Sequence, residues 1–159
     1  MNFNTKDKQT HQATRILCLF VQPLDFLNSI VASFALCSSE CQNYQSLTSA
    51  DRKVNYTYHN ISCDSGLGPG WFRFQGAAGT RMPTSCPPSW RCNAHGSGWL
   101  NGGHPTVAAG RVTKQVCFHW NSDCCHWTTN IQVINCGSFY VYYFSGTGGW
   151  CHGRYCGTD

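Results

Sequence analysis

Charged side chains are scarce in this sequence: Asp, Glu, Lys and Arg make up 11% of its 159 residues, with seven acidic and eleven basic residues. The small basic surplus is dispersed along the chain and forms no continuous basic run, so the chain lacks the kind of surface that follows a nucleic-acid backbone. No nucleic-acid partner is therefore expected. Internal repeats and low-complexity tracts are also missing, which indicates one domain from residue 38 to residue 159.

Long apolar runs are missing as well. The second of two apolar stretches near the N-terminus, Phe26–Leu36, has eleven residues and is interrupted by Asn28 and Ser29. A membrane-spanning helix needs ~20 apolar residues, whereas a stretch of this length after a weakly basic start is typical of a signal peptide. We therefore expect residues 1–37 to be a signal peptide cleaved before Ser38, with a retained signal anchor as the alternative. The mature domain is not expected to span a membrane.

Cysteine, by contrast, is abundant, with 12 residues, a content close to that of disulfide-stapled secreted domains. Cleavage after Cys37 removes Cys18 and Cys37 and leaves an even number that can all pair. Adjacent cysteines on an extended chain point to opposite faces, so Cys124 and Cys125 are expected to bridge to different partners. The sequence does not give the connectivity. The cysteines expected in disulfides are Cys41, Cys63, Cys86, Cys92, Cys117, Cys124, Cys125, Cys136, Cys151 and Cys156.

Metal binding and catalysis are the competing interpretations. Only Cys151 and Cys156 approach the spacing of a structural zinc block, and no second block matches them, so neither a metal nor another cofactor is expected. A glycosidase needs two facing carboxylates, for which Asp64 and Asp123 are the candidates in ordered-looking sequence. No G-x-S-x-G motif is present. We therefore expect a binding module rather than an enzyme, and a small secreted hydrolase is the third hypothesis.

Strand signals dominate the region after residue 38. Alternating apolar residues or runs of aromatic and β-branched residues predict strands at Trp71–Phe74, Arg111–Trp120, Asn130–Cys136 and Phe139–Phe144. Clusters of Gly, Pro, Ser and Asn predict loops at 84–88, 93–98, 101–105 and 145–149. No stretch has the apolar period of an amphipathic helix. The expected fold is all-β: a small disulfide-rich antiparallel sheet module with long loops.

Aromatic residues in the predicted strands and loops call for different interpretations. The Trp71–Phe74 segment is too apolar to be left in water and is expected in the core. Trp90, Trp99 and Trp150 fall in loop-like stretches. An indole in such a place either covers a disulfide, which is the favoured interpretation, or stacks on a sugar ring or a protein partner.

Two N-glycan acceptor triplets follow each other closely, Asn55-Tyr-Thr and Asn60-Ile-Ser. Both lie in a polar stretch between Cys41 and Cys63, where a loop or an exposed hairpin is expected. We expect at least one of the two asparagines to carry a glycan.

A series of short motifs stands in order between the cysteines from Cys41 to the end of the chain: Cys63-Asp64, Gly70-Trp71-Phe72-Arg73-Phe74, Met82-Pro83, Trp99-Leu100-Asn101-Gly102, His104-Pro105, Cys117-Phe118-His119-Trp120, Cys124-Cys125 and Tyr155-Cys156. Ten cysteines in this order with these flanking aromatic residues resemble the cysteine-rich module of uromodulin, the pancreatic zymogen-granule membrane glycoprotein and related zona-pellucida-type proteins.

The resemblance implies a uromodulin-like, all-β module of secreted or membrane-anchored glycoproteins. In the best-known members this module contributes a glycan that bacterial adhesins bind, so that the protein acts as a soluble decoy. Members of the family can carry the acceptor asparagine within Trp-Leu-Asn-Gly-Thr/Ser-His-Pro, but Asn101-Gly102-Gly103 is not an acceptor triplet. The decoy role would therefore depend on Asn55 and Asn60.

We accordingly expect a secreted, extracellular glycoprotein module for binding or glycan display. Its expected partners are an extracellular protein or a carbohydrate-binding partner, including microbial adhesins that engage its N-glycans. The alternative is a structural spacer module of a larger extracellular-matrix or zona-pellucida-type protein.

Overall fold

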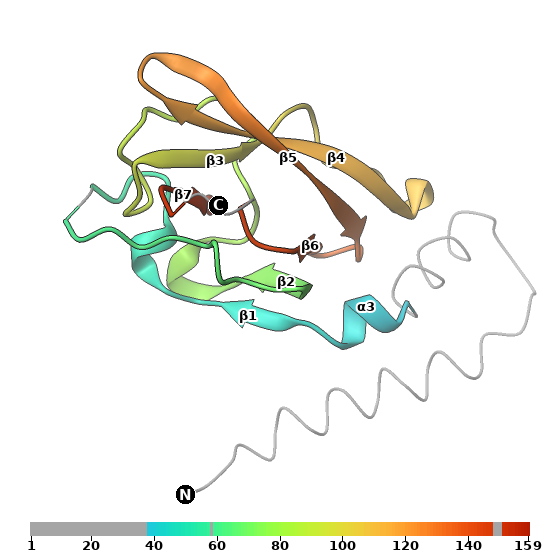
Figure 1. Cartoon of the computed structure of the whole chain (residues 1–159). Helices are drawn as coiled ribbons and strands as arrows, with labels where there is room; N and C mark the ends of the chain where they lie inside the picture. Colours follow the sequence, from blue (N-terminus) through green and yellow to red (C-terminus); the bar gives the residue numbers. More distant parts are fainter. Residues whose placement is uncertain (1–37, 58, 148–150) are drawn as a thin grey trace, which may run out of the picture.

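The computed structural model describes residues 38–57, 59–147 and 151–159. The expected signal peptide, residues 1–37, and Trp150 lie outside the described residues. Seven strands form one sheet in the order β1-β2-β6-β5-β4-β3-β7, and the sheet is strongly twisted (Figure 1). The strands are β1 (Gln45–Leu47), β2 (Gly70–Phe74), β3 (Gly96–Leu100), β4 (Arg111–Trp120), β5 (Asp123–Asn135), β6 (Tyr140–Phe144) and β7 (Gly153–Tyr155). The predicted all-β fold is confirmed.

Helical structure in the described residues is limited to single turns. These are α3 (Ser39–Gln42) and the 3-10 turns η1 (Ala50–Arg52), η2 (Gly76–Ala78) and η3 (Val107–Ala109). None of the helices in this part of the chain is long and apolar enough to cross a bilayer.

The sheet is mixed rather than purely antiparallel. The pairings of β2 with β6, β6 with β5, β5 with β4 and β4 with β3 are antiparallel, as predicted, but β1 pairs with β2 and β3 pairs with β7 in parallel. Parallel neighbours require a long crossover connection. The segments 48–69 and 101–152 supply such connections, and both parallel pairs lie at the edges of the sheet.

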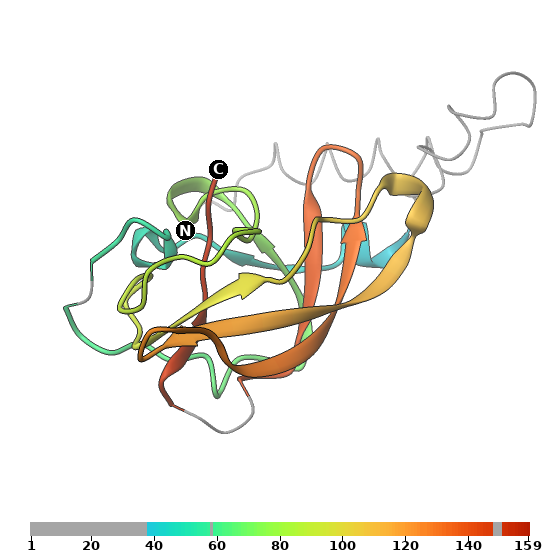
Figure 2. The same cartoon turned by 90° about the horizontal axis from the view of Figure 1, so that it is seen from above.

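The C-terminal segment joins the two edges of the twisted sheet. After β7 has paired with β3, Gly157 forms a bridge with Lys53 and Thr158 forms one with Arg81. In Figure 1, β7 and the C-terminus accordingly lie between β3 and the β1–β2 edge, and Figure 2 shows the same segment crossing the molecule beside the long β4–β5 hairpin. The sheet is thereby nearly closed on itself around one core.

The core consists mainly of aromatic rings. Phe72 and Phe74 of β2 are 3% and 1% exposed, so both are core residues as predicted. Phe144 of β6 stacks on Tyr155 of β7 with ring centroids 3.8 Å apart. Trp71 points to the opposite face of the sheet, where it is half-buried against a smaller cluster around the Cys41–Cys136 disulfide.

The tight turn between β4 and β5 carries Asn121 and Ser122, both at positive φ (50° and 69°). Two successive residues with positive φ are the signature of a type I′ turn, whose twist matches that of the flanking strands. The hairpin pairs Phe118 with Trp127, and their rings stack with centroids 5.3 Å apart. Aromatic residues of both strands therefore gather at this end of the sheet.

The loop predicted at 93–98 is wrong in its second half, because β3 begins at Gly96. A Cβ atom at Gly96 would overlap the ring of Trp127, and one at Gly98 would lie 2.8 Å from Phe118 Cε1. Glycine in a strand often marks such a close approach. The two glycines that suggested a loop thus allow the strand to run directly beneath two aromatic rings. Trp99, which was expected in a loop, therefore lies in β3.

Candidate functional site

The ten cysteines from Cys41 to Cys156 form five disulfides, Cys41–Cys136, Cys63–Cys151, Cys86–Cys124, Cys92–Cys156 and Cys117–Cys125. The adjacent Cys124 and Cys125 bond to different partners. No free cysteine is found in the part of the chain that the structure describes. Four of the bonds join segments 38 to 95 residues apart in sequence, so they cross-link distant parts of the chain.

Asn55 and Asn60, the two predicted glycan acceptors, are both exposed. They lie on a segment that runs along the loop before β3. Thr57 forms an antiparallel bridge with Arg91, whose Nη1 donates a hydrogen bond to the Thr57 hydroxyl. The acceptor side chains therefore project from a segment that is held against the body of the domain.

Asn93 is the main tether of this segment. It is 7% exposed, and its Oδ1 accepts hydrogen bonds from the backbone N–H groups of His59 and Asn60, both at 3.2 Å. Its Nδ2 donates to Asp51 Oδ2 at 3.1 Å and to Ser62 Oγ at 3.2 Å. Asn93 has a φ of 59°, a region that asparagine tolerates better than most residues. One buried carboxamide thus fixes the second acceptor triplet at both of its ends.

Below the tether lies a buried group of ion pairs. Arg154 donates to Asp51 Oδ1 at 3.0 Å, and Arg52 binds both oxygens of Asp64, at 2.7 and 2.8 Å. Partial burial raises the pKa of Asp51, but hydrogen bonds from Arg154, Ser49 and Asn93 outweigh it and lower the pKa to about 2. Asp51 therefore stays ionised and keeps the tether in place.

The structure does not bring Asp64 and Asp123, the carboxylates considered for hydrolysis, together as a facing pair. Asp64 is 2% exposed, and its oxygens are occupied by Arg52 and by the backbone N–H of Tyr155. Asp123 is exposed at the start of β5, where it accepts a hydrogen bond from the N–H of Cys125. Asp64 thus serves the fold, because both of its oxygens are consumed by buried partners.

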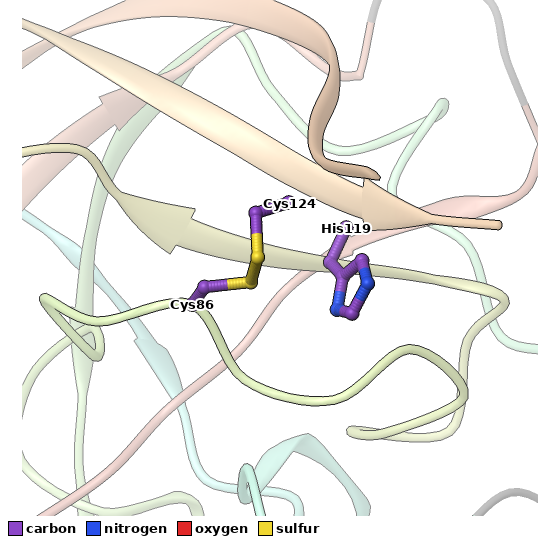
Figure 3. Close-up of side chains that lie close together, drawn as sticks. All are labelled: Cys86, His119 and Cys124. Carbon is purple, nitrogen blue, oxygen red and sulfur yellow. A yellow bond between two sulfur atoms is a disulfide. The ribbon is translucent and has the colours of Figure 1, made fainter. Parts of the chain in front are cut away.

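One group of side chains has the composition of a metal site. Potential ligand atoms of Cys86, His119 and Cys124 lie within 4.8 Å of one another, and Figure 3 shows the His119 ring beside the two sulfur atoms. The two sulfurs are joined as a disulfide, however, so neither is the thiolate that a metal requires. His119 Nδ1 lies 2.6 Å from the carbonyl oxygen of Pro87, to which it donates. This arrangement is a disulfide with a neighbouring imidazole.

The stretch in which the resemblance implies an acceptor asparagine begins with the last two residues of β3, Trp99 and Leu100. Asn101 is exposed, and its Nδ2 donates to Gln115 Oε1 at 2.8 Å. His104 lies further along, with its Nε2 2.8 Å from the hydroxyl of Tyr142, which in turn accepts the N–H of Met82. Burial, aided by the charges of Arg81 and Lys114, lowers the pKa of His104 to about 4.

A groove lies at the turn end of the β4–β5 hairpin. It has a volume of about 290 Å³ and is lined by Trp120, His126, Trp127 and His152; we call these four residues the aromatic–histidine groove. This groove was not predicted from the sequence. The available signal was the presence of Trp120 and Trp127 on either side of a tight-turn candidate, which a hairpin would bring together.

Beside the groove, Trp90 is 46% exposed and stacks on Trp120 with ring centroids 5.6 Å apart. His95 Nδ1 lies 2.9 Å from His152 Nδ1. Desolvation and the neighbouring His152 lower the pKa of His95. Trp99 is different, because its Nε1 donates to the carbonyl oxygen of Cys124 at 2.8 Å and the ring lies next to disulfide-bonded residues.

Comparison with known proteins agrees with the resemblance seen in the sequence. The family model of the uromodulin-like domain matches residues 72–157, which include the last three residues of β2 and all of β3 to β7. Uromodulin of Mus musculus is 44% identical over 108 residues, 67% of this chain and 16% of that protein. The pancreatic secretory granule membrane major glycoprotein GP2 is 45% identical over 120 residues in Canis lupus familiaris and 38% over 122 in Homo sapiens, 75% and 76% of this chain.

The chain spans about a sixth to a quarter of the length of these relatives, 16% of the mouse protein and 23% and 22% of the other two. The family match nevertheless covers more than half of the chain and contains three complete disulfides, Cys86–Cys124, Cys92–Cys156 and Cys117–Cys125. With its mostly stranded, disulfide-rich fold, this chain belongs to the uromodulin-like domain family.

Proposed function

We propose that the chain is a secreted, non-enzymatic glycoprotein module that displays N-glycans to extracellular carbohydrate-binding partners. The observation that carries the proposal is the exposure of Asn55 and Asn60 on a segment tethered by Asn93. A glycan on an anchored segment projects from a defined place, whereas one on a flexible tail samples many. Two of the relatives are glycoproteins by name, which supports the same role.

The five disulfides support secretion, because such bonds form and persist in oxidising compartments. We accordingly propose that residues 1–37 direct secretion and are removed, and that the mature domain is 38–159. The occupied carboxylate of Asp64 gives no support to the hydrolase hypothesis.

The proposed display site differs in place from the one that the family resemblance implies. Asn93 precedes β3 and Asn101 follows it, and a strand of this length spans roughly 15 Å. Because Asn93 holds Asn60, glycans at Asn55 and Asn60 would leave the domain near the opposite end of β3 from Asn101. An adhesin would then approach a different part of the surface.

The test is secretion of the full chain from a eukaryotic cell line, followed by non-reducing peptide mass spectrometry with and without enzymatic glycan removal. We expect a mature N-terminus at Ser38 and a glycan on Asn55, Asn60 or both. The substitutions Asn55→Gln and Asn60→Gln should remove the corresponding glycan mass, and Asn101→Gln, an exposed asparagine outside any acceptor triplet, is the matched control. A mannose-binding bacterial adhesin should bind the secreted chain and lose binding when the glycans are removed.

The spacer hypothesis is the second candidate, and the small share of the relatives' length that this chain spans supports it. A secreted, glycosylated chain that no mannose-binding adhesin retains would favour the spacer over the decoy. Adhesin binding that persists after complete glycan removal would contradict glycan display.

A further inference from the structure

We propose that the aromatic–histidine groove binds one ring of a neutral pyranose sugar, so that the domain recognises carbohydrate itself in addition to any glycan that it carries. This site goes beyond the display function, because it uses protein side chains and no N-glycan.

The groove is shaped for a single ring. Trp120 at the end of β4 and Trp127 on β5 have ring centroids 6.3 Å apart and planes inclined by 50°, so the two rings are in contact and form adjoining walls of the groove. His126 meets the edge of Trp127 at 5.7 Å, and His152 lies 5.9 Å from Trp120. The volume of about 290 Å³ is at the lower end of small-molecule sites, which range over about 300–1,000 Å³. The groove is therefore large enough for one hexose ring and too small for several side chains of a bound peptide.

The lining chemistry matches a sugar. The face of an indole is the negative end of its quadrupole, and it attracts the weakly positive C–H groups on one face of a pyranose. Imidazoles can both donate and accept hydrogen bonds, as sugar hydroxyls require, and His126 and His152 are both exposed. None of the described residues that line the groove is Lys, Arg, Asp or Glu. This composition favours a neutral sugar over a sialylated or sulfated one.

Packing alone does not explain the groove. Trp127 Nε1 is buried and has no hydrogen-bond partner among the described residues, although buried indoles usually have one. Trp90 extends the platform of Trp120 outward while leaving 46% of its own surface exposed. Exposed aromatic clusters of this kind are typical of interaction sites. Three tryptophans therefore gather at one end of the sheet, and the most exposed of them, Trp90, extends the ring surface of the groove towards solvent.

The binding test uses the secreted chain carrying Asn55→Gln and Asn60→Gln, so that its own glycans cannot occupy the groove. Saturation-transfer NMR with methyl β-D-galactopyranoside, methyl β-D-glucopyranoside and methyl α-D-mannopyranoside should show saturable binding of at least one. Saturation should be strongest at the ring protons that face an indole. N-acetylneuraminic acid serves as the charged comparison and should bind more weakly.

Two substitutions test the location. Trp120→Ala removes one wall and should lower the affinity about tenfold, in the lower range of what the loss of a stacking ring costs in nucleobase-binding sites. His152→Ala changes an exposed side chain and should weaken binding without affecting the fold, as near-UV circular dichroism would verify. Trp71→Ala removes a half-buried indole outside the groove and is the matched control.

Absence of saturable transfer from all three glycosides would overturn the proposal. Binding that is unchanged in both Trp120→Ala and His152→Ala would also overturn it. Because the assay uses a chain without acceptor asparagines, its outcome is independent of the adhesin experiment, and either function can fail while the other stands.

Discussion

The side-chain oxygen of Asn93 lies 3.2 Å from the backbone nitrogen of Asn60 and accepts its hydrogen bond, so that a buried residue before β3 holds an exposed glycan acceptor in place. The same oxygen accepts the N–H of His59, and the amide nitrogen binds Asp51 and Ser62. A single carboxamide thereby connects the ion pairs of the interior to the surface from which we propose that glycans project.

Replacing Asn93 by Ala should lower the free energy of unfolding by about 3–7 kcal/mol. The substitution removes four hydrogen bonds, each worth roughly 0.5–1.5 kcal/mol net, and leaves alanine in a left-handed conformation that costs about 1 kcal/mol more. Urea unfolding measures the loss, and hydrogen exchange should accelerate at residues 59–62. Asn101→Ala, which removes one exposed hydrogen bond, is the control, and an equal loss in both variants would refute the role of Asn93.

Asp51 should make the stability of the domain depend on pH below 3.8, the ordinary pKa of an aspartate. Its pKa is about 2 in the folded domain against 3.8 in the unfolded chain, so as the pH falls below 3.8 the unfolded chain takes up a proton that the folded state resists. Stability is therefore lost as the pH falls from 3.8 towards 2. Thermal unfolding of the wild type and of Asp51→Asn should show a steeper decline for the wild type in this window. Parallel curves would contradict the shift.

His104 should also make the domain less stable as the pH is lowered, but at higher pH than Asp51. Its pKa is about 4 in the folded domain and 6.5 when unperturbed. Between pH 6.5 and 4 the unfolded chain therefore binds a proton that the folded domain excludes, and the melting temperature should fall as the pH is lowered through this interval. His104→Gln should flatten that part of the profile. NMR titration of the His104 ring protons gives the pKa directly, and a midpoint near 6.5 would contradict this prediction.

The disulfides should differ in their resistance to reduction according to their burial. Cys92 and Cys156 are both 0% exposed, whereas Cys151 and Cys124 are exposed members of their pairs. Because thiol–disulfide exchange requires access to a sulfur atom, mild reduction followed by alkylation and mass spectrometry should open Cys63–Cys151 and Cys86–Cys124 first. Early opening of Cys92–Cys156 would contradict this order.

Removing the buried bond should also be the more damaging change. Cys92–Cys156 joins residues 64 apart, and the chain-entropy relation assigns a loop of this length about 4 kcal/mol. The double substitution Cys92→Ser and Cys156→Ser should consequently lower stability by that order. The Cys117–Cys125 bond closes a loop of only 8 residues, so Cys117→Ser with Cys125→Ser serves as the comparison, with a smaller expected loss.

Much of the sheet could be predicted from the sequence because β2, β4, β5 and β6 carry runs of aromatic and β-branched residues. The edge strands β1 and β7 have three residues each, too few for a periodic pattern, and both pair with partners distant in sequence. The strand β3 could not be recognised because it contains Gly96 and Gly98. Neither residue has a side chain, and this leaves room for the rings of Trp127 and Phe118 that pack against them. The sequence alone does not distinguish a glycine that permits close packing in a strand from a glycine that forms a turn.

The candidate sites divide in a similar way. The acceptor triplets at Asn55 and Asn60 follow from local sequence alone. The cysteines that form disulfides could also be predicted, but their pairing could not. The tether at Asn93 and the groove between Trp120 and Trp127 could not be found, because both depend on contacts made across the fold. The groove in particular requires the turn at Asn121 and Ser122, whose residues carry a weaker hairpin signal than Asn-Gly.

The closing role of the segment after residue 150 has a consequence for biosynthesis. Cys151 and Cys156 are partners of residues 88 and 64 positions earlier, and Gly157 meets Lys53, so neither edge of the sheet can be completed while the ribosome still holds the last strand. Such distant pairings make folding slow. Cys63 and Cys92 should therefore remain unpaired, or pair wrongly, until Cys151 and Cys156 have been translated, and oxidation catalysts would be needed chiefly from that point on.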